Sequence, residues 1–259
     1  MHAAEREQLI LQLLDDRGFI GFQELDQRLD ASPATLRRDL ERLASNGQIV
    51  RVRGGARLVG GRAERQHLSG VPFHENIGRH AREKEAIGRM AASLCAPGET
   101  VIIDGGSTTL RMCPHLEPLA LHVLTTSLHI VSALLPQPNT QISIPGGTVF
   151  REQNIVLSPF DDDGASRYRA SKMFLGSAAV GAHGVMQTDT LLIQAERRLL
   201  GRADRVILLV DSSKFEAPAG QVLCQLSEIS TLITDQGLPD RCAQDVERAG
   251  VKLIIAPRA

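Results

Sequence analysis

The sequence predicts two domains: a small helical domain that ends in a hairpin, followed by a larger α/β domain with a largely parallel sheet. Three observations support this prediction. The first 47 residues fit three short helices, residues 48–58 alternate apolar and basic side chains around a Gly-Gly turn, and apolar runs alternate with helical segments beyond residue 83. With 259 residues, the chain is long enough for both domains.

The composition is that of an ordinary globular protein, with 42% hydrophobic and 23% charged residues. The chain has no Trp, one Tyr and seven Phe, which disfavours a single-strand nucleic-acid binder that stacks bases on aromatic rings. The four cysteines form no C-x-x-C pair and have no zinc-like histidine spacing, so we expect reduced thiols and no metal site. No cofactor is expected. Without a secretory signal or membrane-length apolar run, the chain is predicted to be cytoplasmic, with no membrane partner.

Three helices are predicted in the N-terminal domain. Apolar residues recur at helical spacing over residues 10–14 and again over 22–29. The third helix is predicted to begin after Ser32, which is a favourable N-cap, since Pro33 suits the first helical position. It is predicted to end near Asn46. The alternating segment that follows is predicted to be a hairpin, or wing.

The distribution of charge favours double-stranded DNA as a partner of this domain. Residues 1–57 have no net charge, but residues 32–57, the third helix and the wing, carry a net charge of +4. These two elements contact DNA in a winged helix-turn-helix. A helical bundle with a solvated arginine face is the alternative on pattern alone. The residues expected to contact DNA are Ser32, Pro33, Thr35, Arg37, Arg38, Arg42, Arg51 and Arg53.

We predict a DNA-binding domain over residues 1–59, a linker over 60–80 and a second domain over 81–259, because glycine, proline and mixed charge mark the middle segment. Strand-like apolar runs occur in the second domain at 100–104, 122–125, 141–144, 172–175, 205–210, 231–234 and 251–255. Helical segments are expected at 86–94, 109–116, 130–135, 191–200 and 241–249.

A candidate ligand-binding loop follows the first of these strands. Asp104 ends the strand, and Gly105, Gly106, Ser107, Thr108 and Thr109 follow it. Glycines let a ligand approach the backbone, and a helix N-terminus with hydroxyl side chains favours an anion such as phosphate. A tight structural connection is the alternative. Lys84 and the pair Gly146-Gly147, after another strand, are further candidates for the same site.

A carboxylate and an ammonium group, Asp211 and Lys214, follow a later strand, and Glu196 lies on a predicted helix. In isolation these would be solvated surface charges. A phosphosugar isomerase with a DNA-binding appendage would use Glu196 as base and Lys214 to polarise the carbonyl. An enzyme has no use for a recognition helix and wing, so we predict a regulator rather than an enzyme. The glycine-rich loop argues against an architectural DNA binder that lacks a ligand.

Two ordered motifs resemble the DeoR family of bacterial sugar-catabolism repressors. The first is S-x-x-T-I/L-R-R-D-L-x-x-L, present here as Ser32-Pro33-Ala34-Thr35-Leu36-Arg37-Arg38-Asp39-Leu40-Glu41-Arg42-Leu43. The second is G-x-I/L-x-R-x-x-G-G-A, present over residues 47–56, with Arg53 where the family often has His. The glycine-rich loop and the Asp211–Phe215 segment also stand in the order that the family's sensor domain has. Residues 154–159 and 172–174 resemble the branch of L-ascorbate-utilisation repressors.

The resemblance implies a sensor domain similar to ribose-5-phosphate isomerase that binds a phosphorylated sugar. It implies that Ser107, Thr108 and Thr109 hold the phosphate, that Thr125, Thr126, Asp211 and Lys214 contact the sugar or line its pocket, and that Glu196 occupies the isomerase base position. Asp104, Gly105, Gly106, Gly146 and Gly147 complete the expected effector site. Because DNA half-sites require at least a dimer, we expect a homodimer or homotetramer that represses a sugar or sugar-acid catabolic operon.

Overall fold

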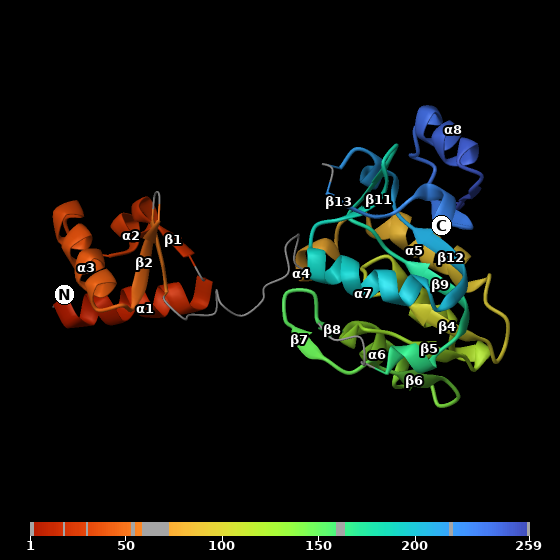
Figure 1. Ribbon diagram of the computed structural model, residues 1–259, viewed down its shortest axis with the longest axis horizontal. Helices are drawn as coiled ribbons and strands as arrows, with labels where there is room; N and C mark the ends of the chain where they lie inside the picture. The colour runs from red at the N-terminus through yellow and green to blue at the C-terminus, as the bar shows by residue number, and fades with distance from the viewer. Residues whose placement is uncertain are drawn as a thin grey trace. The chain divides into compact units, whose positions relative to one another are not determined.

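The computed structural model describes residues 3–17, 19–29, 31–52, 55–58, 73–158, 164–217 and 220–257. The chain divides into two compact units, Met1–His67 and Leu68–Ala259 (Figure 1). Arg53, which was expected to contact DNA, lies outside the described residues. Within those ranges no helix combines the length and apolar character needed to cross a bilayer.

The first unit is a winged helix-turn-helix. Its helices are α1 (Ala3–Arg17), α2 (Phe22–Arg28) and α3 (Pro33–Ser45), and its strands are β1 (Phe19–Gly21), β2 (Ile49–Val52) and β3 (Gly55–Leu58). Strand β3 lies between β1 and β2 in an antiparallel sheet. The three predicted helices and the wing are present. Strand β1 was not predicted, because three residues are too few to display an alternation.

Helix α3 begins as its sequence predicts. The hydroxyl of Ser32 accepts a hydrogen bond from the backbone N–H of Thr35 at 3.2 Å, and Pro33 occupies the first turn. The leucine stripe of α3 is buried against α1, α2 and the wing, whereas Arg37 and Arg38 are exposed. The buried core of this unit consists of Ile10, Leu14, Ile20, Leu25, Leu29, Leu36, Leu40, Leu43, Ile49 and Ala56.

The second unit is built on a seven-stranded sheet in the order β15-β14-β12-β9-β4-β5-β6, and each neighbouring pair is parallel. Each of these strands overlaps a strand run predicted from the sequence, because strands buried on both faces are marked by continuous apolar runs, and β9 and β12 each begin two residues before the predicted run. They are β4 (Thr100–Ile103), β5 (His122–Leu124), β6 (Gln141–Ser143), β9 (Ala170–Leu175), β12 (Ala203–Leu209), β14 (Thr231–Thr234) and β15 (Lys252–Ile255).

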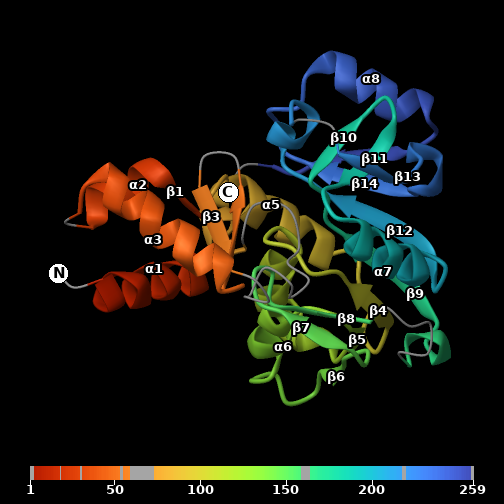
Figure 2. The ribbon, with the colours of Figure 1, turned by 60° about the vertical axis from the view of Figure 1, so that its left-hand side comes forward.

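Helices cover both faces of this sheet (Figures 1 and 2). On one face α5 (Ala81–Ala92), α6 (Leu128–Leu134) and the 3-10 helix η2 (Thr109–His115) share a core with Phe174 of β9. On the other face α7 (Thr190–Leu200) and α8 (Asp240–Arg248) share a core with Met173 and Leu175. Successive residues of one strand thus enter opposite cores, which is the alternation that a sheet between two helical layers requires.

The second unit also contains short elements that the sequence did not predict. A hairpin is formed by β7 (Thr148–Phe150) and β8 (Ile155–Leu157), and a small antiparallel sheet by β10 (Ala179–Gly181), β11 (Gly184–Gln187) and β13 (Gln221–Cys224). The remaining short helices are α4 (Phe73–Asn76), η3 (Glu117–Leu119), η4 (Ala165–Arg167), η5 (Ser212–Phe215) and η6 (Leu226–Glu228).

Two details differ from the sequence prediction. The helix expected at 109–116 is the 3-10 helix η2, which spans seven residues and contains Pro114, a residue without an N–H to continue an α-helix. The range predicted as a linker, 60–80, contains α4, and the backbone N–H of its buried first residue, Phe73, donates to the carbonyl of Glu152 at 3.0 Å. Part of the predicted linker therefore packs on the second unit.

Candidate functional site

The topology of the parallel sheet creates a crevice between β4 and β9. From β4 the sheet extends outward through β5 to β6, whereas from β9 it extends in the other direction through β12 and β14 to β15. Connections that leave neighbouring strands in opposite directions open a crevice at the carboxyl ends of those strands, and ligands of open α/β sheets bind there. The loops that follow β4 and β9 are therefore the expected place for a ligand site.

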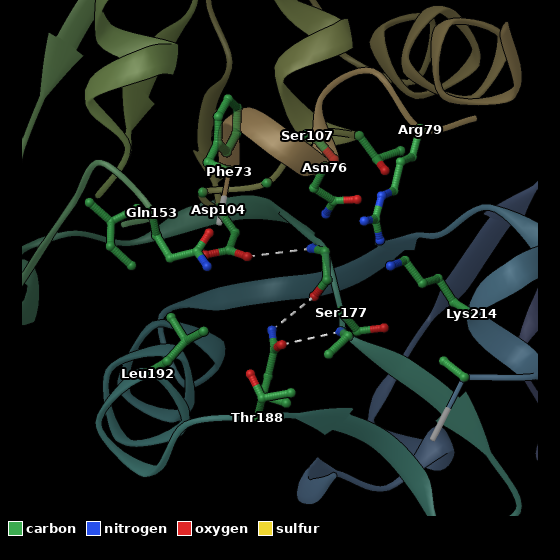
Figure 3. Close-up of a pocket in the computed structure, with 18 residues that line it drawn as sticks. Phe73, Asn76, Arg79, Asp104, Ser107, Gln153, Ser177, Thr188, Leu192 and Lys214 are labelled. Carbon is green, nitrogen blue, oxygen red and sulfur yellow. Dashed lines mark hydrogen bonds between the residues drawn. The ribbon is translucent and has the colours of Figure 1, made fainter. Parts of the chain in front are cut away.

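A cavity of about 490 Å³ lies at this place (Figure 3). The loop after β4 contributes residues 104–108, the loop after β9 contributes residues 176–178, and η5 contributes Lys214. The predicted effector residues Asp104, Gly105, Gly106, Ser107, Thr108 and Lys214 thus line one cavity. Its other lining residues are Phe73, Asn76, Arg79, Gln153, Ile155, Gln187, Thr188, Leu192 and Ala217.

The loop after β4 is closed by its own threonine. The hydroxyl of Thr109 donates to the carbonyl oxygens of Asp104 and Gly106, at 2.7 and 2.9 Å. Gly105 has no room for a side chain, because a Cβ there would lie 2.7 Å from a methyl of Ile155. Thr109 is buried and shapes the loop, while Ser107 and Thr108 lie at the cavity wall. The predicted role of an α-helix N-terminus does not apply, since η2 is a short 3-10 helix.

The cavity has two chemically different ends (Figure 3). Arg79 and Lys214 lie on the same side as Ser107 and bring two positive charges to it. Gln153, Thr188 and Leu192 lie on the opposite side. One end is therefore suited to an anion, and the other to neutral hydroxyl groups against a partly apolar wall.

Two buried carboxyl groups adjoin the cavity. Asp104 lines it and accepts a hydrogen bond from the backbone N–H of Gly176 at 3.4 Å. Glu196 lies behind Gln187, whose side-chain amide donates to both carboxylate oxygens at 2.8 and 3.0 Å. Burial raises the pKa of Asp104 to about 6. Burial, together with the charge of Asp104, raises the pKa of Glu196 well above its ordinary value.

The other predicted effector residues do not line this cavity. Thr125 and Thr126 are buried in the loop after β5, where the hydroxyl of Thr125 accepts from the backbone N–H of Ser127 at 3.1 Å. Gly146 and Gly147 precede the β7–β8 hairpin. Asp211 is buried and caps η5 by accepting from the backbone N–H of Ser213 at 3.2 Å. Glu196 reaches the cavity only through Gln187.

Sequence reasoning missed the contribution of segment 73–80. Its residues Phe73, Asn76 and Arg79 line the cavity, yet they fall in the range assigned to the linker. The sequence offered one sign of this role: Phe73 is an isolated aromatic residue in a polar stretch, which favours a packed position over a linker. Gln187 was also missed, because strand β11 is too short to stand out in the sequence.

The arginines of the first unit differ in whether they form ion pairs with carboxylates. Arg38 is exposed and forms no ion pair with a described residue. Arg37 is exposed, and its guanidinium lies over the ring of Phe22, 5.4 Å from the ring centroid. Arg42 pairs with Glu7 and, at 3.2 Å, with Asp39, and Arg51 pairs with Glu41 at 3.0 Å.

Asp39 therefore has a structural role within the recognition helix. It is buried and accepts from the guanidinium of Arg6 at 2.7 Å, which joins α1 to α3. Arg37 and Arg38 are thus more available for DNA than Arg42 and Arg51, which already have carboxylate partners.

The two units define a class of protein: a winged helix-turn-helix with exposed arginines on its recognition helix, joined to an α/β domain with a ligand-sized cavity. Residues 6–60 match the DeoR-like helix-turn-helix domain, and residues 79–236 match the DeoR C terminal sensor domain. The chain belongs to the DeoR family of transcriptional regulators. The predicted function, DNA-binding transcriptional regulation, is confirmed at this level.

Two relatives match over almost their whole length. The HTH-type transcriptional regulator UlaR of Shigella dysenteriae serotype 1 is 31% identical over 254 residues, which cover 98% of this chain and 99% of that protein. UlaR of Escherichia coli strain K12 / DH10B has the same identity and coverage. Both relatives are named as regulators rather than enzymes.

Among solved structures, ribose 5-phosphate isomerase A of Methanocaldococcus jannaschii matches with a TM-score of 0.38 and 15% identity, over 51% of this chain and 53% of that one. The delta subunit of eIF2B from Chaetomium thermophilum matches with a TM-score of 0.41 and 17% identity, over 54% and 50%. The fold assignment rests on the strand order and the family matches.

Proposed function

We propose that this regulator represses a sugar or sugar-acid catabolic operon and that a phosphorylated sugar, or a related metabolite, controls it from the cavity between β4 and β9. The observation that carries the proposal is the polarity of that cavity. Arg79, Lys214 and the Ser107 hydroxyl stand at one end, where a phosphate is held by charge and hydrogen bonds. Asp104 and the side chain of Gln153 offer polar groups for sugar hydroxyls.

The volume of the cavity agrees with this ligand class. About 490 Å³ lies within the range of small-molecule sites and accommodates a sugar phosphate together with ordered water. The apolar wall formed by Phe73, Ile155 and Leu192 suits the C–H faces of a sugar ring. A cavity of this volume is too small for a DNA duplex, so we assign DNA to the first unit.

On the DNA side, we propose that Arg37 and Arg38 provide the main contacts to the operator. Both are exposed on the first turns of α3, the part of a recognition helix that reaches base edges and phosphates. Ser32, Pro33 and Thr35 shape the start of that helix. The hydroxyl groups of Ser32 and Thr35 lie 2.8 Å apart and share a hydrogen bond, which orients the turn.

The assembly we propose is a cytoplasmic homodimer or homotetramer, since a palindromic operator requires two heads. The similarity to UlaR over 98% of the chain supports the placement in the branch of L-ascorbate-utilisation repressors. A phosphorylated sugar acid is therefore the first ligand to test.

We do not propose isomerase activity. An isomerase base must reach a substrate C–H bond, and both oxygens of Glu196 accept from Gln187, which separates this carboxylate from the cavity. Turnover of ribose 5-phosphate by the purified protein would overturn this conclusion.

A thermal-shift screen of sugar phosphates and sugar-acid phosphates tests the proposed function. A ligand that binds the folded protein raises the melting temperature, by linkage. Replacing Ser107 by tryptophan fills the positively charged, anion-binding end of the cavity and should abolish the shift. Ser93→Trp is the matched control, because Ser93 is exposed and does not line the cavity. An equal rise in melting temperature in both variants would show that the ligand binds outside this cavity.

A further inference from the structure

Segment 73–80 lines the cavity and is the first described part of the second unit. Phe73, Asn76 and Arg79 line the cavity (Figure 3). In the chain, residues 59–72 alone separate this segment from β3, the last strand of the first unit. We propose that segment 73–80 transmits cavity occupancy to the DNA-binding unit and that Lys84 positions it. This inference rests on the proposed function and names the device by which the effector acts.

The segment is held by a few polar contacts. Arg111 donates to the carbonyl of Ile77 at 3.3 Å, and the N–H of Phe73 donates to the carbonyl of Glu152 at 3.0 Å. The ring of Phe73 stacks on His129, with centroids 4.0 Å apart. Beyond Phe73 no residue of the segment is buried. A segment with so little buried apolar surface changes position at low cost.

Lys84 holds the segment through two hydrogen bonds. Its side chain is fully buried, at 0% exposure, although it carries an ammonium group. The ammonium donates to the backbone carbonyl of Asn76 at 2.7 Å and to the side-chain oxygen of Asn76 at 3.2 Å. Both acceptors lie on the segment. Because Lys84 does not line the cavity, it acts on an effector through Asn76 and is a positioning residue.

Charge links this lysine to an anion in the cavity. Its charged neighbours are Asp211, Lys214, Arg111 and Arg79, three cations against one carboxylate. Arg79 and Lys214 also line the cavity. An anion bound there offsets the mutual repulsion of this cluster and favours the position of the segment in which Arg79 reaches the anion.

The joint at the end of the segment is suited to movement. His80, between α4 and α5, has a left-handed backbone, with φ 51° and ψ 41°. A residue without glycine's freedom is strained in this conformation, and such strain is found where segments switch. Within segment 73–80, Asn76 accepts the hydrogen bonds that hold the segment to Lys84, Arg79 brings a positive charge to the cavity, and His80 is the residue about which the segment would turn.

Hydrogen–deuterium exchange on the full chain tests the inference, with inorganic phosphate as the probe and chloride at equal ionic strength as the reference. Phosphate should slow exchange at residues 104–109, the loop that binds it, and also at residues 73–80. Slower exchange at 104–109 alone would overturn the inference and leave the proposed function standing. No change at either place would overturn both.

Operator affinity provides the second measurement, using a duplex selected by the wild-type protein from a randomised pool. We expect saturating phosphate to change the wild-type Kd at least about fivefold. Lys84→Met should reduce this change to less than about twofold while exchange at 104–109 remains slowed. Asn76→Ala, which removes one acceptor and keeps the lysine, should reduce it in the same way and is the second variant if Lys84→Met does not fold.

Arg79→Gln and Arg82→Gln form a matched pair. Both arginines are exposed and lie three residues apart, but Arg79 lines the cavity and Arg82 does not. Arg79→Gln should weaken phosphate binding about tenfold, and Arg82→Gln should leave it unchanged. A full response of operator affinity to phosphate in both Asn76→Ala and Lys84→Met would overturn the inference.

Discussion

Replacing Lys84 by methionine should remove a pH dependence of the second unit's stability. Burial lowers the pKa of Lys84 from 10.5 to about 8, and the opposing attraction of Asp211 does not restore it. Between these two values the unfolded chain holds a proton that the folded protein has released. The free energy of unfolding of the wild type therefore contains a contribution that rises as pH increases through this window. From about pH 7 to about pH 9 the contribution amounts to about 1 kcal/mol.

The single tyrosine makes this measurement specific. The chain has no Trp, and Tyr168 packs against the core of the second unit, so tyrosine fluorescence during urea unfolding reports that unit. We expect the difference in unfolding free energy between wild type and Lys84→Met to change by about 1 kcal/mol between the two pH values. Lys252→Met is the control, because Lys252 is exposed. A difference that stays constant within about 0.3 kcal/mol would refute the assignment of a destabilised buried ammonium.

Other substitutions test the two units separately. Arg38→Ala should weaken operator binding by about 1–3 kcal/mol and lower its salt dependence in a gel-shift titration, whereas Arg248→Ala on α8 should not; equal effects would contradict the recognition-helix assignment. Gly88→Val should cost the second unit several kcal/mol in urea, because a Cβ at Gly88 would lie 2.5 Å from the backbone of η2, and Gly78→Val, with open space around it, should cost little. Asp39→Asn should lower the melting temperature of the first unit, because the guanidinium of Arg6 loses its buried carboxylate partner. Helical circular dichroism follows this transition, and an unchanged melting temperature would count against a structural role of Asp39.

The elements that were predicted correctly share one property. Strand Thr100–Ile103 and the buried part of β12, residues 206–209, are almost entirely apolar because both faces are covered, and a window of a few residues reveals them. The start of α3 was equally legible, because an N-cap and a proline act over three residues. The short antiparallel strands have no such window. Strands β7, β8 and β10 have three residues each, too few to show an alternation, and β11 pairs with a strand far along the chain, as with Val185 and Cys224.

The candidate site was predicted in part for the same reason. The loop Asp104–Thr108 carries its own signal, and it does line the cavity. Glu196 was expected at the site only from the family resemblance, and Gln187 stands between this carboxylate and the cavity. Arg42 looked equivalent to Arg38, yet folding places Glu7 and Asp39 beside it. Whether a charged side chain already has a charged partner can depend on a residue far along the chain, as Arg42 and Glu7 show.

The sequence by itself determined the class of this protein: two domains, the recognition helix with its arginines, the strands of the parallel sheet and the glycine-rich loop. These features depend on consecutive residues, whose periodicity and turn chemistry act locally. The tertiary structure decided which side chains meet. It placed Asn76 and Arg79, from a segment that looked like linker, in the wall of the cavity, and it buried Lys84 beneath them. Contacts of this kind arise only when distant elements pack against each other, because burial and charge pairing are properties of the assembled core.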